Sequence, residues 1–253
     1  MWLIVVNKEI WSNRSTNMKL TVIYDNETKK GLNSGWGFSC LIETVAHNIL
    51  FDTGWDGHVL LANMEKLGIS PEDIDTLVLS HQHWDHIGGV PTFLNMQPDV
   101  NVFIPASFSP NLKKEISTRG KEAGTSTSLS NMDSSVGPRL HDIKIPQEIC
   151  RGVYTTGELG KEIKEQSLIL DSGKGLYVIT GCAHPGLPAI LDAASSFGNV
   201  IGILGGLHDS QEYDLFKSMH LIGAGHCTAH KKEIKMKYPD AFVDIFAGYS
   251  MEF

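Results

Sequence analysis

Four side chains that bind metal ions in proteins stand close together in the segment His81-x-His83-x-Asp85-His86. The segment directly follows residues 75–79, a short apolar run that predicts a buried strand. Alternate residues of an extended chain project to the same side, so His81 and His83 can bind one metal ion while Asp85 and His86 turn toward a neighbouring position. Zinc sites use imidazole and carboxylate ligands, and catalytic sites keep one position open for water. We therefore predict a catalytic metal site with these four residues as ligands.

A site with its histidines on one loop needs further ligands from downstream. Three histidines each follow an apolar stretch and glycine, which is how the end of a strand delivers a ligand: His184, His208 and His226. We predict that His184 and His226 are metal ligands. His208 and Asp85 are predicted to act in catalysis, where Asp85 holds the second metal or the nucleophile and moves protons. The alternative for a single histidine of this kind is a core or surface side chain that binds nothing.

Two segments carry a resemblance to a known family: Phe51-Asp52-Thr53-Gly54 and Leu79-Ser80-His81-x-His83-x-Asp85-His86-x-Gly88-Gly89. They are similar to the signature of metallo-β-lactamase-like proteins, and the resemblance covers essentially the whole chain from Met18. It implies an α/β fold, the αβ/βα four-layer sandwich of metallo-β-lactamase type, with two divalent metal ions along one edge. Zinc is the expected metal, with manganese and iron as alternatives. The resemblance also implies that Asp52 orients the metal-binding loop without ligating, whereas the alternative for Asp52 is a simple turn residue.

The sequence departs from the superfamily pattern at one ligand. The superfamily commonly places a bridging aspartate at a strand end late in the chain, and no obvious aspartate stands there. Cys182 occupies a comparable place and can ligate as a thiolate, because a metal lowers the pKa of a thiol. Glu158 is the other candidate. Either residue is alternatively a support that holds a ligand in place.

Five short segments carry a finer resemblance, to the subgroup of dihydropterin ribofuranosylaminobenzene phosphate synthase-like metal-dependent hydrolases: 38–43, 154–158, 181–184, 205–208 and 226–228. It implies pterin-type chemistry for some members. The ligands favour a hydrolase, in which a metal acidifies a bound water and the hydroxide attacks an ester, lactone, amide or phosphate bond. One alternative is a transferase of the pterin-synthase kind, whose metal binds a diphosphate leaving group. Another is a di-iron redox protein or a metal sensor.

Composition limits the partners and the location of the protein. The formal net charge is −8, and no basic stripe marks a nucleic-acid interface. No apolar run approaches the roughly 20 residues needed to cross a bilayer. The cysteines form no C-x-x-C pair, which favours a reduced, cytoplasmic protein. We expect a small, anionic substrate, while the oligomeric state is not indicated. The polar segment 106–140 offers cations for such a substrate, or only a solvated surface: Lys113, Lys114, Arg119 and Lys121.

The elements that must position these residues follow from apolar patterning. Residues 1–17 are predicted to be an N-terminal extension and residues 18–253 a single domain. Strands are predicted at 20–24, 38–43, 48–51, 75–79, 100–104, 167–170, 176–180, 200–204 and 241–246. Helices are predicted at 57–67, 188–197 and 212–221, and Ser70 with Pro71 predicts another helix start. The segment 106–140 is predicted to be a surface excursion such as a lid. A hairpin followed by a metal-like loop in each half indicates two related, β-rich halves.

Overall fold

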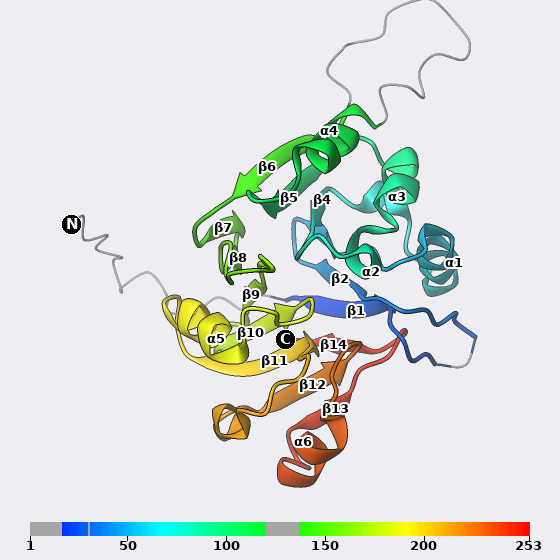
Figure 1. The fold of residues 1–253 in the computed structure, drawn as a ribbon. Helices are drawn as coiled ribbons and strands as arrows, with labels where there is room; N and C mark the ends of the chain where they lie inside the picture. Colours follow the sequence, from blue (N-terminus) through cyan, green and yellow to red (C-terminus); the bar gives the residue numbers. More distant parts are fainter. Residues whose placement is uncertain (1–16, 30, 120–136) are drawn as a thin grey trace, which may run out of the picture.

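Two seven-stranded mixed sheets form the centre of the protein (Figure 1). The structure is a computed structural model that describes residues 17–29, 31–119 and 137–253. Across the first sheet the strands are β14 (Ser250–Glu252), β1 (Lys19–Tyr24), β2 (Ser39–Glu43), β3 (Asn48–Phe51), β4 (Thr76–Val78), β5 (Asn101–Pro105) and β6 (Arg139–Ile143). Across the second they are β13 (Phe242–Asp244), β12 (Leu221–Gly225), β11 (Val200–Gly206), β10 (Leu176–Thr180), β9 (Leu168–Asp171), β8 (Val153–Thr155) and β7 (Gln147–Cys150). Each half of the chain thus builds one sheet, apart from β14.

Helices cover the outer face of each sheet. The first sheet packs against α1 (Gly57–Leu67), α2 (Trp84–Ile87), α3 (Val90–Met96) and α4 (Pro110–Thr118), while η2 (Pro71–Asp73) contacts α3. The second packs against α5 (Leu187–Ser195), η4 (Tyr213–Phe216) and α6 (Lys231–Lys237). The predicted bounds of α1 are confirmed, because Asp56 caps its first turn by accepting the His58 N–H and Gly68 ends it in the left-handed conformation.

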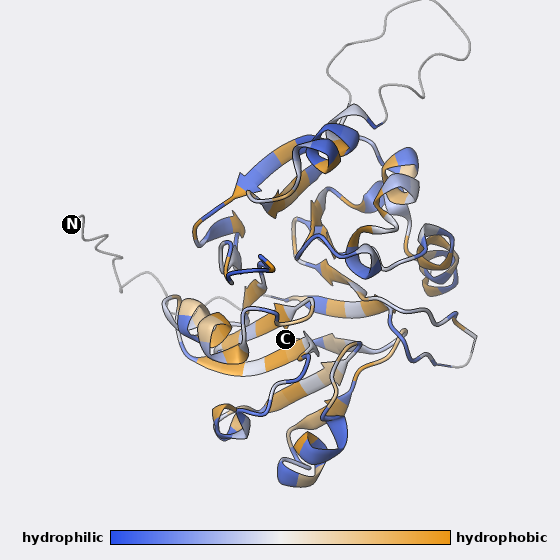
Figure 2. Ribbon diagram, viewed as in Figure 1, coloured by the Kyte–Doolittle hydropathy of each residue, from blue (hydrophilic) through white to orange (hydrophobic). Residues whose placement is uncertain are grey.

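Alternation along the strands divides the buried side chains into three apolar clusters. In β2, Leu41 faces the helices, whereas Cys40 and Ile42 face the other sheet. In β10, Val178 packs toward α5, whereas Ile179 faces the first sheet. One cluster therefore lies between the sheets, and one lies between each sheet and its helices. Figure 2 shows apolar residues gathered in the strands. The predicted αβ/βα four-layer sandwich is confirmed.

Parallel pairing gathers the loops that carry the predicted site residues. Strands β3, β4 and β5 run parallel in the first sheet, as do β10, β11 and β12 in the second. Parallel strands have their carboxyl ends on the same edge of a sheet. The loops after β3 and β4 therefore leave the first sheet at one edge, and the loops after β10, β11 and β12 leave the second sheet at one edge. Open α/β sheets bind ligands at such an edge.

Two predictions about elements are wrong. Residues 212–221 are not a helix: only the single turn η4 forms, because the backbone N–H of His220 pairs with the Ile201 carbonyl oxygen and draws the chain into β12. The segment 106–140 is not one loop excursion, since it contains α4 and the start of β6, and Ile116 of α4 is buried in the core. Residues 120–136, with Lys121, lie outside the described residues, as does the predicted N-terminal extension up to residue 16. Within the described ranges, no helix is long and apolar enough to cross a membrane.

Candidate metal centre

The predicted site residues gather where the loops of the two sheets meet, and the backbone there is strained. Across the described residues, the non-glycine positions with positive φ are Asp52 (56°), Ala183 (58°), His208 (48°) and His226 (45°). Each stands in a loop that follows a strand end at this edge. Left-handed backbone at such residues costs energy and persists where surrounding contacts enforce it, which is typical of functional sites.

His81, His83 and His184 form the first group of donors. Their ligand atoms all lie within 4.8 Å of one another, and His81 Nε2 is 3.1 Å from His83 Nδ1. Nε2 of His184 is buried and has no hydrogen-bond partner among the described residues. A buried imidazole nitrogen without a partner is costly, whereas a bound cation would satisfy it. This observation fits a metal ion held by three histidines.

Asp85, His86 and His226 form the second group. His86 Nε2 lies 3.2 Å from His226 Nε2, and Asp85 Oδ2 lies 3.3 Å from His226 Nε2 and 3.9 Å from His86 Nε2. With metal–nitrogen and metal–oxygen distances of about 2.0–2.2 Å, ligands at tetrahedral angles are about 3.3–3.6 Å apart. The spacing of this group therefore fits a second metal ion. Cys182 adjoins it, with its sulfur 3.1 Å from His86 Nε2.

Asp52 orients one histidine of each group: His86 directly and His81 through Ser80. Its Oδ2 accepts a hydrogen bond from His86 Nδ1 at 2.7 Å and another from the Ser80 hydroxyl at 2.6 Å. The same hydroxyl lies 2.8 Å from His81 Nδ1, so His81 is held through Ser80. In both rings Nε2 is left facing the centre. On His226, Nδ1 lies 3.1 Å from Asn26 Oδ1, with the same effect. Such outer contacts fix the ring orientation of metal ligands.

Two buried carboxylates that the sequence analysis missed also support the centre. Glu165 accepts the backbone N–H groups of Cys182, Ala183 and His184 at 2.9–3.0 Å, and Asp25 accepts that of His226 at 2.9 Å. Nothing in the spacing of the sequence marked either residue, because these contacts join distant segments.

The charges around the centre favour a cation. Among the described residues, the buried carboxylates are Asp25, Asp52 and Glu165, and all three contact the candidate ligands or their loops. No buried lysine or arginine stands among those residues to balance them. Buried charges are normally paired or coordinate metals, so the donor set fits divalent cations.

The electrostatics keep most of these imidazoles neutral, which is the form that binds metal. Burial, with nearby histidines, lowers the pKa of His81, and burial and His83 lower that of His184 to about 4. His86 is the exception: burial acts to lower its pKa, but the Asp52 carboxylate raises it above the ordinary value. The Asp85 carboxyl has a lowered pKa, since His226 and His86 outweigh its burial. Burial raises the pKa of Asp25 to about 6.

The remaining predicted residues lie at the rim or away from the centre. His208 is exposed, and its ring centroid is 4.9 Å from that of His184. Glu158 uses its carboxylate to accept the Ser107 N–H and is not part of either donor group.

The predicted cations of segment 106–140 are largely engaged elsewhere. Lys113 pairs with Asp142 at 2.8 Å, and Arg119 pairs with Glu115 at 2.6 Å. These contacts favour the alternative of a charged surface.

One exposed tryptophan, Trp36, contacts the centre, and two more stand exposed in the neighbouring loops. Trp36 is 58% exposed, its indole N–H donates to Asp85 Oδ2 at 2.9 Å, and its ring lies 5.4 Å from that of His226. Trp84, next to Asp85 in the chain, is 68% exposed, and Trp55 is 57% exposed. No motif in the sequence marked Trp36 as part of the site.

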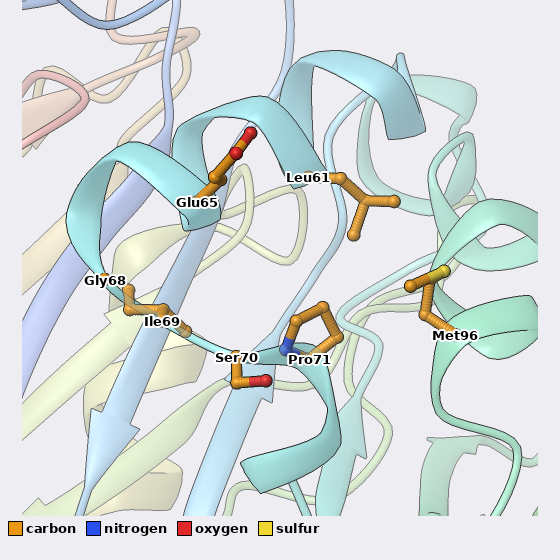
Figure 3. Close-up of a pocket in the computed structure, with 7 residues that line it drawn as sticks. All are labelled: Leu61, Glu65, Gly68, Ile69, Ser70, Pro71 and Met96. Atoms are coloured by element: carbon orange, nitrogen blue, oxygen red, sulfur yellow. The ribbon is translucent and has the colours of Figure 1, made fainter.

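A surface depression elsewhere is not part of the centre. It lies where α1 ends and η2 begins, beside α3 (Figure 3). Its lining contains none of the candidate metal ligands: Leu61, Glu65, Gly68, Ile69, Ser70, Pro71 and Met96.

Comparison with known proteins agrees with this architecture. The structure of Tm1679, a metal-dependent hydrolase of the β-lactamase superfamily, matches with a TM-score of 0.66 at 23% identity, over 93% of this chain and 99% of that chain. A diphosphatase from the PhnP family matches with a TM-score of 0.59 at 17% identity, over 94% and 97%.

A curated relative matches along most of the sequence. The 7,8-dihydropterin-6-methyl-4-(beta-D-ribofuranosyl)-aminobenzene-5'-phosphate synthase of Methanocaldococcus jannaschii is 27% identical over 266 residues, 86% of this chain and 90% of the relative. The family model of the metallo-beta-lactamase superfamily matches residues 37–195. The resemblance found in the sequence is thereby confirmed, and the chain belongs to the metallo-β-lactamase superfamily.

Proposed function

We propose that this protein is a hydrolase that holds two divalent metal ions, zinc in the first instance, and cleaves an ester, lactone, amide or phosphate bond of a small anionic substrate. The observation that carries the proposal is the convergence of two donor groups, one of three histidines and one of Asp85, His86 and His226, at a single edge of the sandwich. Metal ions held there would supply a Lewis acid and lower the pKa of water toward neutrality.

The residues around the centre have distinct tasks in this proposal. Three neutral histidines leave the full charge of the first cation available to attract an anionic substrate. Asp85 has a lowered carboxyl pKa and a side chain that is 15% exposed, so it would stay ionised as a ligand and could accept a hydrogen bond from a nucleophilic water. His208 stands exposed beside His184, where its imidazole can donate a proton to a leaving group.

Metal content tests the first half of the proposal. The purified protein should hold about two equivalents of metal by elemental analysis, since each donor group supplies the ligands of one ion. His83→Ala should lose a large part of that content. His47→Ala is the control, because His47 pairs with Asp75 and lies outside both donor groups. A protein that takes up no metal after reconstitution would contradict the proposal.

Turnover tests the second half. The loaded protein should hydrolyse at least one class among simple phosphodiesters, phosphomonoesters, lactones and esters. His208→Ala should keep its metal and lose turnover, because His208 belongs to neither donor group. Full metal content without hydrolysis of any of these classes would reject the hydrolase and leave the metal centre standing.

A transferase of the pterin-synthase kind is the second candidate, and two observations favour it. The curated synthase resembles most of this chain. Trp36, whose indole N–H donates to Asp85, exposes a flat aromatic surface beside the centre, and such a surface stacks well on a flat ring. Release of diphosphate only when a dihydropterin diphosphate and a second, nucleophilic substrate are both present would favour this candidate over the hydrolase.

A further inference from the structure

Two cysteines meet at the second donor group although the strands before them are not neighbours. Cys182 follows β10 and Cys227 follows β12, with β11 between them. A Cβ atom at Gly206 of β11 would come within 2.3 Å of the Gly181 carbonyl oxygen and 2.7 Å of the Cys227 sulfur. The glycine therefore lets the two loops close over the middle strand and bring both thiols to the centre.

The Cys182 sulfur has the spacing of a metal ligand. It lies 3.1 Å from His86 Nε2, which itself lies 3.2 Å from His226 Nε2. With a metal–sulfur distance of about 2.3 Å and a metal–nitrogen distance of about 2.0 Å, tetrahedral sulfur and nitrogen donors are about 3.5 Å apart. His86 links these residues to Asp85, since its Nε2 also lies 3.9 Å from Asp85 Oδ2.

Cys182 also faces the first donor group, and Cys227 does not. Ligand atoms of His81, His86 and Cys182 lie within 4.8 Å of one another, which joins the two groups through Cys182. Among the described residues, Cys227 forms a group of this spacing with Cys182 and His226 and with no member of the first donor group, and its thiol donates to the Cys182 carbonyl oxygen at 3.8 Å. Cys182 is also the more enclosed residue, at 3% exposure.

We propose that the Cys182 thiolate is the fourth ligand of the second metal ion and lies between the two metals, while Cys227 stays beside it without ligating. The inference rests on the proposed metal centre. The thiol proton passes to solvent as the metal–sulfur bond forms, so no oxidant or reductant is needed. A soft thiolate donor makes the second position select zinc, cobalt or cadmium over magnesium and manganese.

Cobalt titration of the full-length, metal-free protein tests the proposal without an activity assay. Cobalt(II) bound by thiolate shows a sulfur-to-cobalt charge-transfer band in the near ultraviolet, and cobalt bound by histidine and carboxylate shows only visible ligand-field bands. We expect the charge-transfer band in the wild-type protein and in Cys227→Ser. Cys150→Ser is the matched control, because Cys150 is a half-buried free cysteine on β7, outside the donor groups.

The band should vanish in Cys182→Ser and in Cys182→Asp. The aspartate variant guards against misfolding, since its carboxylate can replace the thiolate and should keep two cobalt equivalents with ligand-field bands alone. A charge-transfer band that survives in Cys182→Asp, or one lost in Cys227→Ser, would overturn the proposal. Wild-type protein that binds cobalt without the band would reject only the thiolate ligand, whereas protein that binds no cobalt would reject the metal centre itself.

Discussion

Asp52→Asn should weaken metal binding at both positions, and more strongly at the second. Asparagine has nearly the same shape as aspartate, but its amide group donates where the Oδ2 atom of Asp52 accepts. That atom accepts from His86 Nδ1 at 2.7 Å and from the Ser80 hydroxyl at 2.6 Å, and both bonds are fully buried. The backbone N–H of Ser80 can still donate to the remaining oxygen, as it does now at 2.7 Å.

The expected magnitude follows from these contacts. A hydrogen bond to a charged group contributes about 1.5–3 kcal/mol. Loss of an outer partner of a metal-binding histidine weakens metal affinity about 10–100-fold. We therefore expect the position of His86 to lose about 10–100-fold in zinc affinity, equal to about 1.4–2.8 kcal/mol. The three-histidine position should lose less, because Asp52 reaches His81 only through Ser80.

Calorimetric titration of the metal-free protein with zinc measures both affinities. Asp75→Asn provides the matched control. Like Asp52, the Asp75 carboxylate contacts a histidine ring and accepts a backbone N–H, but it stands away from the centre. Circular dichroism shows whether either variant remains folded. Unchanged zinc binding in a folded Asp52→Asn protein would refute the argument that Asp52 orients the ligands.

Three further predictions follow from the same contacts. Metal-free wild-type protein should lose thermal stability relative to His184→Gln as pH falls from about 7 to about 4, because the unfolded chain protonates histidine near 6.5 while folded His184 resists until a pKa of about 4; a difference between the two melting temperatures that does not change with pH would contradict this. Trp36→Phe removes a donor to Asp85 and should weaken zinc binding about fivefold, whereas Trp55→Phe should not, as titration will show. Glu165→Gln should cost about 1–3 kcal/mol of unfolding free energy in urea, and a stability equal to wild type would disprove its role.

Local patterns predicted those parts of the fold and site that depend on neighbours in the chain. The helix α1 carries its own cap and its own terminating glycine, Gly68, so its bounds could be predicted. The segment from His81 to His86 was recognisable for the same reason. In contrast, β6 was missed because it is largely exposed and polar, which hides the alternation that marks a strand.

Residues that support the site through long-range contacts carried no such signal. Trp36 donates to Asp85 from 49 positions away, and Asp25 binds the backbone of His226 across 201 positions. Glu165 meets the loop of Cys182 only because β9 and β10 form a hairpin beside it. These partners are set by how the two sheets pack, and a single sequence contains no direct record of that packing.

The strain and the charge of the centre together imply that metal binding and folding are coupled. Left-handed backbone at a non-glycine residue costs about 1–3 kcal/mol, and four such residues lie in these loops. The buried carboxylates of Asp25, Asp52 and Glu165 are held by His86 and by backbone N–H groups, and no buried lysine or arginine among the described residues neutralises them. A cation held by the histidines would lower the energy of the same folded arrangement and would have no preformed site in the unfolded chain. Metal binding at the proposed centre would therefore contribute directly to the free energy of folding, and the loops around the centre would depend on it most.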